Sequence, residues 1–261
     1  MDSIRAAATR LRHNWRRVAA VALAVLLLGA AGGTLYFNQG FHGNAGSIEQ
    51  VRTSETVNVE QAHGGYVLSP ANASTTGTAV VFYPGARVEP DAYLATFAPI
   101  VEHAGVTVYV PDLPLNVGLL GVGTAGEIQQ SAPAVDRWYV GGHSLGGVAA
   151  CRYASNSPER VDGLVLFASY CDQNVSEQEL AVLSVTGTRD TVLDRAAYDD
   201  ARGRLPADAV YREIDGANHS QFGSYSGQRG DEPAAISYEE AHDRIATAVV
   251  EWLGENNSKR G

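Results

Sequence analysis

Apolar runs that alternate with helical segments are the feature that most restricts what this chain can fold into. Six runs predict strands, of which the first is continuously apolar and typical of burial on both faces, and they lie at residues 77–85, 106–111, 137–142, 163–169, 180–187 and 209–215. Helical patterns lie between or after them, at residues 90–105, from Leu145, after Thr191 and from Ser237. Such alternation is typical of a mostly parallel sheet with helices on both faces, so the sequence predicts an α/β fold.

The predicted folded domain covers residues 57–254. It begins with two short strands around a turn at residues 56–70, which gives the sheet an antiparallel start. A polar, glycine-bearing linker at residues 38–56 precedes the domain, and residues 255–261 form a flexible tail. With 45% hydrophobic and 18% charged residues, the composition excludes a disordered or fibrous chain.

The first 37 residues differ in composition from the rest. A basic N-terminus at residues 1–17 contains five arginines and precedes an uncharged apolar stretch at residues 18–37. Twenty helical residues span about 30 Å, the thickness of a bilayer's hydrocarbon core, so we expect a transmembrane anchor there. Arginine collects on the cytoplasmic side, which places the following domain outside the cytoplasm. The alternative is a cleaved signal peptide and a secreted domain.

Acidic residues dominate the charge of the chain, whose formal net charge is −10. Five of the 19 basic residues and one of the 29 acidic residues precede residue 38, so the remainder carries about −14. Such a surface repels nucleic acid and anionic headgroups, and the expected partners are small molecules or neutral polymers. No histidine or cysteine pair has zinc-ligand spacing, and neither a metal nor a cofactor is expected.

The only two cysteines, Cys151 and Cys171, leave two interpretations open. An oxidising exterior allows them to form a disulfide. Two buried thiols fit the sequence equally well.

The sequence GGHSLGG at residues 141–147 lies between a predicted strand and a predicted helix, which is the setting of a nucleophile elbow. A serine in such a strained turn keeps its hydroxyl exposed, and Gly142 and Gly146 leave room for the bend. The following helix points its first N–H groups at negative charge that forms near Ser144. The motif therefore favours a nucleophilic role for Ser144 over a structural turn.

A serine nucleophile needs a histidine base and a carboxylate that orients the histidine, in the chain order serine, acid, histidine. His219 and His242 follow Ser144, and His219 is favoured because it lies in a glycine-flanked loop after the final strand. His242 falls in the last amphipathic helix, where we expect a surface position. Asp190 directly follows the preceding strand and is the favoured acid. Asp172 and Asp194 are the rival acids, and the alternative interpretation of each is structural, as a turn residue and as a helix cap.

Two backbone donors are expected for a tetrahedral oxyanion. The N–H of Leu145 is the first, and the second comes from the loop at residues 83–86. Pro84 has no N–H, so Ala86 is the expected second donor. Arg87 beside it is either a residue that orients the substrate or an ordinary solvated arginine.

Five segments match one protein family in the same order. They are VVFYPGARVEPDAYL, GGHSLGG, VDGLVLFASY, VTGTRD and GANHSQFGSYSGQRGDEPAAIS. From about Val57 to Leu253 the chain resembles the α/β-hydrolase superfamily, most closely its small dienelactone-hydrolase-like members, which lack a large cap domain and often carry an N-terminal membrane anchor. The resemblance implies an α/β-hydrolase fold with Ser144 as nucleophile, Asp190 as acid and His219 as base, and hydrolysis of an ester or related acyl bond. Dienelactone hydrolases carry cysteine at the elbow, so the serine favours a carboxylesterase.

Three further expectations concern the surroundings of the site. Only a short link at residues 170–179 lies where this superfamily commonly inserts a lid, so we expect an open site. The side chains of Asn218 and Gln221 are expected to hold the loop that carries His219, which we call the histidine loop, by hydrogen bonds. Four leucines form either a wall of the acyl pocket or ordinary packing under a helix, namely Leu113, Leu115, Leu119 and Leu120.

The sequence thus predicts a serine hydrolase that cleaves a carboxylic ester through an acyl-enzyme intermediate. A lipase or acyltransferase that acts on cell-envelope lipids shares the same residues and is the first alternative. The second alternative is a catalytically silent hydrolase fold that serves binding. The sequence does not indicate the oligomeric state.

Overall fold

The computed structural model describes residues 39–71 and 77–259, together with the isolated residues 19, 22, 23, 32, 33 and 36. The chain divides into two units, Met1–Gln39 and Gly40–Gly261, and the second contains the folded domain.

Most of the predicted anchor at residues 18–37 lies outside the described residues, as does the whole basic segment at residues 1–17. Both stay predictions. Among the residues that are described, no helix combines the length and the apolar character that a membrane crossing requires.

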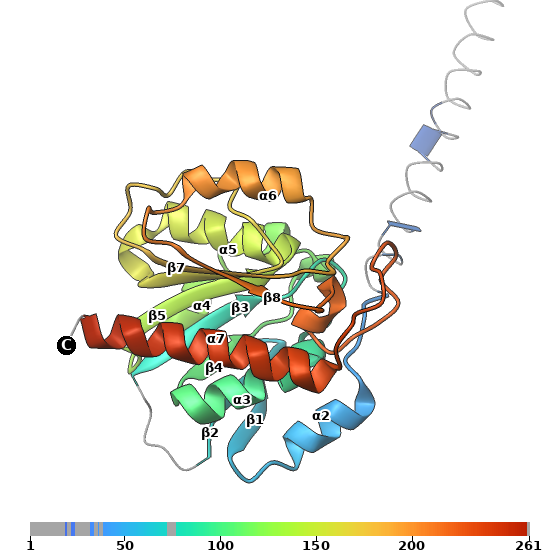
Figure 1. Cartoon of the computed structure of the whole chain (residues 1–261), viewed down its shortest axis with the longest axis horizontal. Coiled ribbons are helices and arrows are strands. Elements are labelled where there is room, and N and C mark those ends of the chain that lie inside the picture. Colours follow the sequence, from blue (N-terminus) through green and yellow to red (C-terminus); the bar gives the residue numbers. More distant parts are fainter. Residues whose placement is uncertain are drawn as a thin grey trace, which may run out of the picture. The chain divides into compact units, whose positions relative to one another are not determined.

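An eight-stranded sheet forms the centre of the second unit (Figure 1). Its strands lie in the order β1-β2-β4-β3-β5-β6-β7-β8. They are β1 (Val57–Ala62), β2 (Gly65–Pro70), β3 (Thr78–Tyr83), β4 (Thr107–Val110), β5 (Arg137–His143), β6 (Gly163–Phe167), β7 (Ala181–Gly187) and β8 (Val210–Ile214). β1 pairs antiparallel with β2, and β2 with β4, whereas the pairs from β4 to β8 are parallel. The predicted α/β fold with its antiparallel start is confirmed.

Helices cover both faces of this sheet. They are α2 (Ala45–Arg52), α3 (Leu94–Ala104), α4 (Thr124–Ser131), α5 (Leu145–Asn156), α6 (Arg195–Ala201) and α7 (Tyr238–Lys259). Buried side chains of α2, α3 and α7 pack on one face, and those of α4 and α5 pack on the other. Figure 1 shows α6 on the same side as α5. Successive side chains of a strand point to opposite faces of the sheet. In β3, Val80 and Phe82 therefore point to one core, and Val81 and Tyr83 point to the other.

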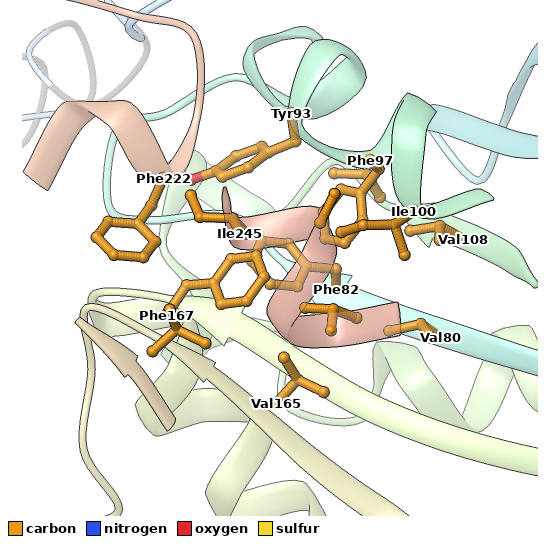
Figure 2. Packing of buried hydrophobic residues seen from close by; sticks show 14 of the residues in the cluster. Val80, Phe82, Tyr93, Phe97, Ile100, Val108, Val165, Phe167, Phe222 and Ile245 are labelled. Carbon is orange, nitrogen blue, oxygen red and sulfur yellow. The ribbon is translucent and has the colours of Figure 1, made fainter. Parts of the chain in front are cut away.

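Aromatic rings fill the core between the sheet and the helices α3 and α7 (Figure 2). The ring centroid of Phe82 lies 4.6 Å from that of Phe97 and 5.2 Å from that of Phe167, and Phe222 lies 5.7 Å from Phe167. Phe222 ends a short 3₁₀ helix, His219–Phe222. Its buried ring therefore anchors this segment beside the end of β6.

Residues 40–56 of the predicted linker fold with the second unit. Asn44 caps α2 by accepting a hydrogen bond from the Gly46 N–H at 2.9 Å, and Val51 of this helix is buried in the core. The sequence gives little sign of this helix, because Val51 is its one fully buried residue.

The link between β6 and β7 is short. Residues 168–180 contain no helix and no strand, in agreement with the predicted absence of a large cap domain.

Candidate active site

Ser144 lies at a sharp turn between β5 and α5. Its φ of 52° and ψ of −125° are unusual for a residue with a side chain and carry backbone strain. Two contacts to the end of β6 hold the turn. The Ser144 N–H donates to the Phe167 carbonyl at 3.0 Å, and the Ser169 hydroxyl donates to the Ser144 carbonyl at 2.6 Å. The geometry is that of the predicted nucleophile elbow.

Two glycines allow this bend, because a side chain at either position would collide with neighbouring backbone atoms. A Cβ atom on Gly142 would lie 2.3 Å from the carbonyl carbon of Gly146. One on Gly146 would lie 2.1 Å from the Tyr83 carbonyl oxygen, which belongs to the end of β3. The start of α5 can therefore approach both β5 and the loop after β3 only with glycine at these positions.

His219 and Asp190 form a buried pair. Nδ1 of His219 lies 2.8 Å from Oδ2 of Asp190, and the two side chains are 1% and 0% exposed. The other carboxylate oxygen, Oδ1, accepts the backbone N–H groups of Val192 and Leu193, each at 2.9 Å. Asp190 is thus fixed from both sides, and it aims one oxygen at the imidazole.

The contacts of Asp190 keep it charged. Burial raises the pKa of its carboxyl, but the hydrogen bond and charge of His219, helped by the N–H groups of Leu193 and Val192, outweigh burial and hold the pKa below its usual range. Because the carboxylate can only accept, Nδ1 of His219 is the donor of this hydrogen bond. In a neutral His219, this leaves Nε2 as the acceptor.

The rival residues occupy other roles. Asp172 pairs with Arg152 at 2.7 Å, and Asp194 caps α6 by accepting the Ala197 N–H at 3.0 Å. The predicted surface position of His242 is wrong. Its ring is buried because this side of α7 packs against the histidine loop, where Nε2 lies 2.9 Å from the Gly223 carbonyl oxygen.

One surface cleft is lined by both Ser144 and His219, and its volume is about 200 Å³. Its other walls are formed by Leu145, Val148, Ala168, Ser169, Tyr170, Val192, Leu193 and Asp194. Nε2 of His219 is buried and makes no hydrogen bond to any described residue, so it is not bonded to the Ser144 hydroxyl in this structure. Such bonds are often long in free enzymes and shorten when substrate binds. The structure therefore brings Ser144 and His219 to one cleft, with Asp190 buried behind His219 and no serine–histidine hydrogen bond formed.

The two predicted oxyanion donors, Leu145 and Ala86, have backbone N–H groups that donate no hydrogen bond within the described part of the chain. The N–H groups on either side of Ala86 are occupied, since Gly85 and Arg87 each donate at 2.8 Å to other groups. Because Pro84 has no N–H, Ala86 carries the free donor of this loop.

A buried hydrogen-bond chain links this loop to the elbow. The Tyr93 hydroxyl accepts the Gly85 N–H at 2.8 Å and lies 2.9 Å from Nδ1 of His143. Burial lowers the pKa of His143 well below its usual range, and the charge of His219 lowers it further. A neutral His143 accepts the tyrosine proton at Nδ1. The sequence does not reveal this contact, because the two residues lie 50 positions apart.

Side chains around His219 hold its backbone in place. Asn218 and Gln221 each accept the other's N–H at 3.2 Å, which is the hydrogen bonding that the sequence predicts for them. Asp231 was missed. Its carboxylate accepts the N–H groups of His219 at 3.1 Å and Ser220 at 2.8 Å. The only signal in the sequence is the polar, glycine-rich run after His219. This run does not indicate which of its residues bonds to the backbone of His219.

The leucine-rich loop does not line the cleft. Leu113 is buried and Leu119 packs against the same core, so ordinary packing is the interpretation that fits these two. Leu115 and Leu120 are 39% and 59% exposed. Arg87 also lies away from the cleft lining, with its guanidinium carbon 5.1 Å from the centre of the Phe41 ring.

Cys151 and Cys171 form a disulfide, which decides between the two interpretations of these residues. Both cysteines are fully buried. Cys151 lies in α5, and Cys171 directly follows the cleft residues Ala168, Ser169 and Tyr170. The bond therefore ties one wall of the cleft to the helix that begins at the elbow.

Replacing both cysteines by alanine is expected to lower the free energy of unfolding by about 3 kcal/mol, because the disulfide closes a loop between residues 20 positions apart. Urea unfolding of the wild type and of the double variant Cys151→Ala, Cys171→Ala measures the difference. Wild-type protein in a reducing agent is the control and should move in the same direction. An unchanged unfolding midpoint in the double variant would contradict the expectation.

Comparison with known families supports the fold. A model described as the alpha/beta hydrolase family matches residues 79–243, well over half of the chain. The match begins in β3 and ends in α7, so it includes the elbow and the loops of Asp190 and His219. A search of curated proteins gives no match. The family match and the mostly parallel sheet agree, and the chain belongs to the alpha/beta hydrolase family.

Proposed function

We propose that this protein is a serine hydrolase that cleaves carboxylic esters through an acyl-enzyme intermediate. Membership of the alpha/beta hydrolase family supports a hydrolase. The observation that carries the finer proposal is the buried pair of His219 and Asp190, 2.8 Å apart, on a cleft that the strained Ser144 also lines. A serine becomes a nucleophile when a histidine oriented by a carboxylate can take its proton.

In the first half-reaction, the Ser144 hydroxyl oxygen attacks the acyl carbon of the ester and its proton passes to Nε2 of His219. Asp190 stabilises the imidazolium that forms. The free N–H groups of Leu145 and Ala86 donate to the oxyanion. His219 then gives the proton to the alcohol oxygen as the ester C–O bond breaks, and the acyl group stays on Ser144.

In the second half-reaction, water replaces the alcohol. Its oxygen attacks the acyl carbon while His219 takes one proton, and the same proton returns to the Ser144 oxygen as the carboxylic acid leaves. Water is the only co-substrate that this sequence of steps consumes.

The small cleft favours short acyl groups. Its volume of about 200 Å³ lies below the range of about 300–1,000 Å³ typical of pockets for drug-sized ligands. Val148, Val192 and Leu193 give it an apolar lining beside Tyr170. Such a lining favours burial of a few methylene groups at about 0.8 kcal/mol each, and a longer chain does not fit into this volume.

Hydrolysis of 4-nitrophenyl esters of graded acyl length tests the activity and the size limit together. We expect kcat/KM to be highest between the acetate and the butanoate and at least about 100-fold lower for the dodecanoate, since the pocket has no room for the longer chain. Heat-denatured protein is the control for background hydrolysis. No turnover of any ester contradicts the esterase and favours a binding protein. Undiminished turnover of the dodecanoate favours the lipase or acyltransferase.

The hydrolase unit is held at the outer face of a membrane by residues 18–37. Two observations support this part of the proposal. Arginines gather before the uncharged stretch, as on the cytoplasmic side of membrane helices. The buried disulfide Cys151–Cys171 suits an oxidising compartment. Recovery of the full-length protein in the soluble cytoplasmic fraction after cell lysis, with both thiols reduced, is the result that argues against it.

A further inference from the structure

The segment Phe41–Asn44, which we call the clasp, contacts the two loops that carry the candidate oxyanion donor Ala86 and the candidate base His219. It belongs to the same unit as the rest of the hydrolase domain. The sequence predicts it as part of a linker, and nothing in the catalytic steps above uses it.

The clasp pairs with the loop after β3. Phe41 donates its N–H to the Arg87 carbonyl at 2.6 Å and accepts the Glu89 N–H at 2.9 Å, which forms a parallel bridge. Further along, the Gly43 N–H donates to Oδ1 of Asp91 at 2.9 Å. These bonds attach the clasp to the residues that directly follow Ala86.

The clasp also contacts the segment after His219. The Asn44 N–H donates to the Ser224 carbonyl at 2.7 Å, and the rings of Phe41 and Tyr225 lie 5.5 Å apart. Ser224 in turn donates its N–H to the Ala92 carbonyl at 2.7 Å, so the two loops also meet directly. The ring of Phe41 thus contacts both loops, Tyr225 on one and Arg87 on the other.

Arg87 shows why this contact bears on Ala86. Its φ of 60° lies in the left-handed region, which a residue with a side chain adopts only when its surroundings impose it. Phe41 meets Arg87 twice, through the backbone bond to its carbonyl and through the guanidinium that lies 5.1 Å from the ring centre. Because Ala86 directly precedes Arg87, a backbone shift at Arg87 also displaces the segment that carries the Ala86 N–H.

We propose that the clasp is a positioning element of the active site, in which Phe41 fixes the backbone donor of Ala86 relative to His219. The inference rests on the proposed serine hydrolase function. Phe41 does not line the cleft, so it acts through Arg87 and Tyr225 rather than on the substrate. An oxyanion forms only after the nucleophile attacks. A displaced donor therefore lowers kcat and leaves KM nearly unchanged.

Two substitutions in the full-length protein test the clasp. Phe41→Ala removes both ring contacts. Gly43→Ala places a Cβ atom 2.8 Å from the Asp91 carbonyl oxygen and 3.0 Å from Cα of Ala92, which pushes the clasp off the loop. Phe41→Tyr retains the aromatic face and should recover most of the lost kcat. Gly203→Ala is the matched control, because no atom lies within 4 Å of the added methyl group.

The rate is measured on 4-nitrophenyl acetate as kcat per active site, with the sites counted by fluorophosphonate titration so that unfolded protein does not contribute. We expect Phe41→Ala and Gly43→Ala each to lower kcat about tenfold with KM within twofold of wild type, part of the 10²–10³-fold loss of a whole oxyanion donor. Their affinity for a trifluoromethyl ketone, which binds as an oxyanion adduct, should fall by the same factor.

If both variants keep the wild-type kcat per titrated site, the proposed positioning role of the clasp is wrong, whether or not their thermal stability falls. A loss confined to KM also overturns it, because that result places Phe41 in substrate binding. If the wild-type protein itself neither reacts with the fluorophosphonate nor hydrolyses the ester, the proposed function fails. If only the proposal about the clasp is wrong, the wild-type protein is still active. The experiment therefore distinguishes this outcome from failure of the proposed function.

Discussion

Substitution of Ser144 by alanine is expected to lower kcat on 4-nitrophenyl acetate by about 10⁶-fold, the loss typical of a serine hydrolase deprived of its nucleophile. The reason is chemical, since alanine leaves no hydroxyl for His219 to activate at the elbow. The fold should remain, because the turn is held by backbone bonds to Phe167 and by the Ser169 hydroxyl, and none of these uses the Ser144 side chain.

Ser131→Ala is the matched control for this result. Ser131 ends α4, is exposed, and donates its hydroxyl to the Ile128 carbonyl at 2.7 Å. We expect it to retain wild-type activity. Steady-state rates and circular dichroism of both variants make the comparison. A Ser144→Ala protein that is folded and keeps more than a tenth of the wild-type kcat would remove Ser144 from the mechanism.

Substitution of Asp190 by asparagine is expected to lower kcat by about 10⁴-fold with little change in KM. Asparagine retains an oxygen for the N–H groups of Val192 and Leu193, so the loop should keep its shape. Its amide nitrogen, however, donates to Nδ1 of His219 and forces the ring proton onto Nε2. In that tautomer the imidazole cannot take the proton of Ser144.

Asp172→Asn is the control, because this rival acid pairs with Arg152 at the surface and lies outside the cleft. We expect its kcat to stay within about threefold of wild type, as is usual for a surface ion pair that contributes little. Parallel kinetics of the two variants decide between the acids. Equal losses at Asp172 and Asp190, or full activity in Asp190→Asn, would contradict the assignment.

The features that could be predicted from sequence are those that nearby residues determine. β3 and β5 are continuous apolar runs because both of their faces are buried, and β5 leads directly into the glycines of the elbow. Ser144 follows from this local setting. The pairing of His219 with Asp190 could be predicted from their chain order after Ser144 and from their positions just after the last two strands.

The features that were missed depend on contacts between distant residues. Asp231 holds the backbone of His219 from 12 residues away, and Tyr93 reaches His143 across 50. Their polar groups have no period that a strand or helix pattern could reveal. The burial of His242 was mispredicted for a related reason. Its side of α7 packs against the polar loop that carries His219, and its ring bonds to the Gly223 carbonyl in that loop. The apolar pattern of α7 does not predict a contact of this kind.

The most direct test of the proposed chemistry is to find which residue a serine-directed reagent modifies. The full-length protein is reacted with a fluorophosphonate and digested, and its peptides are sequenced by mass spectrometry. We predict one adduct per chain, on Ser144, with no adduct in the Ser144→Ala variant and none in heat-denatured protein. An adduct on another residue, or equal labelling of the Ser144→Ala variant, would contradict a mechanism built on Ser144, His219 and Asp190.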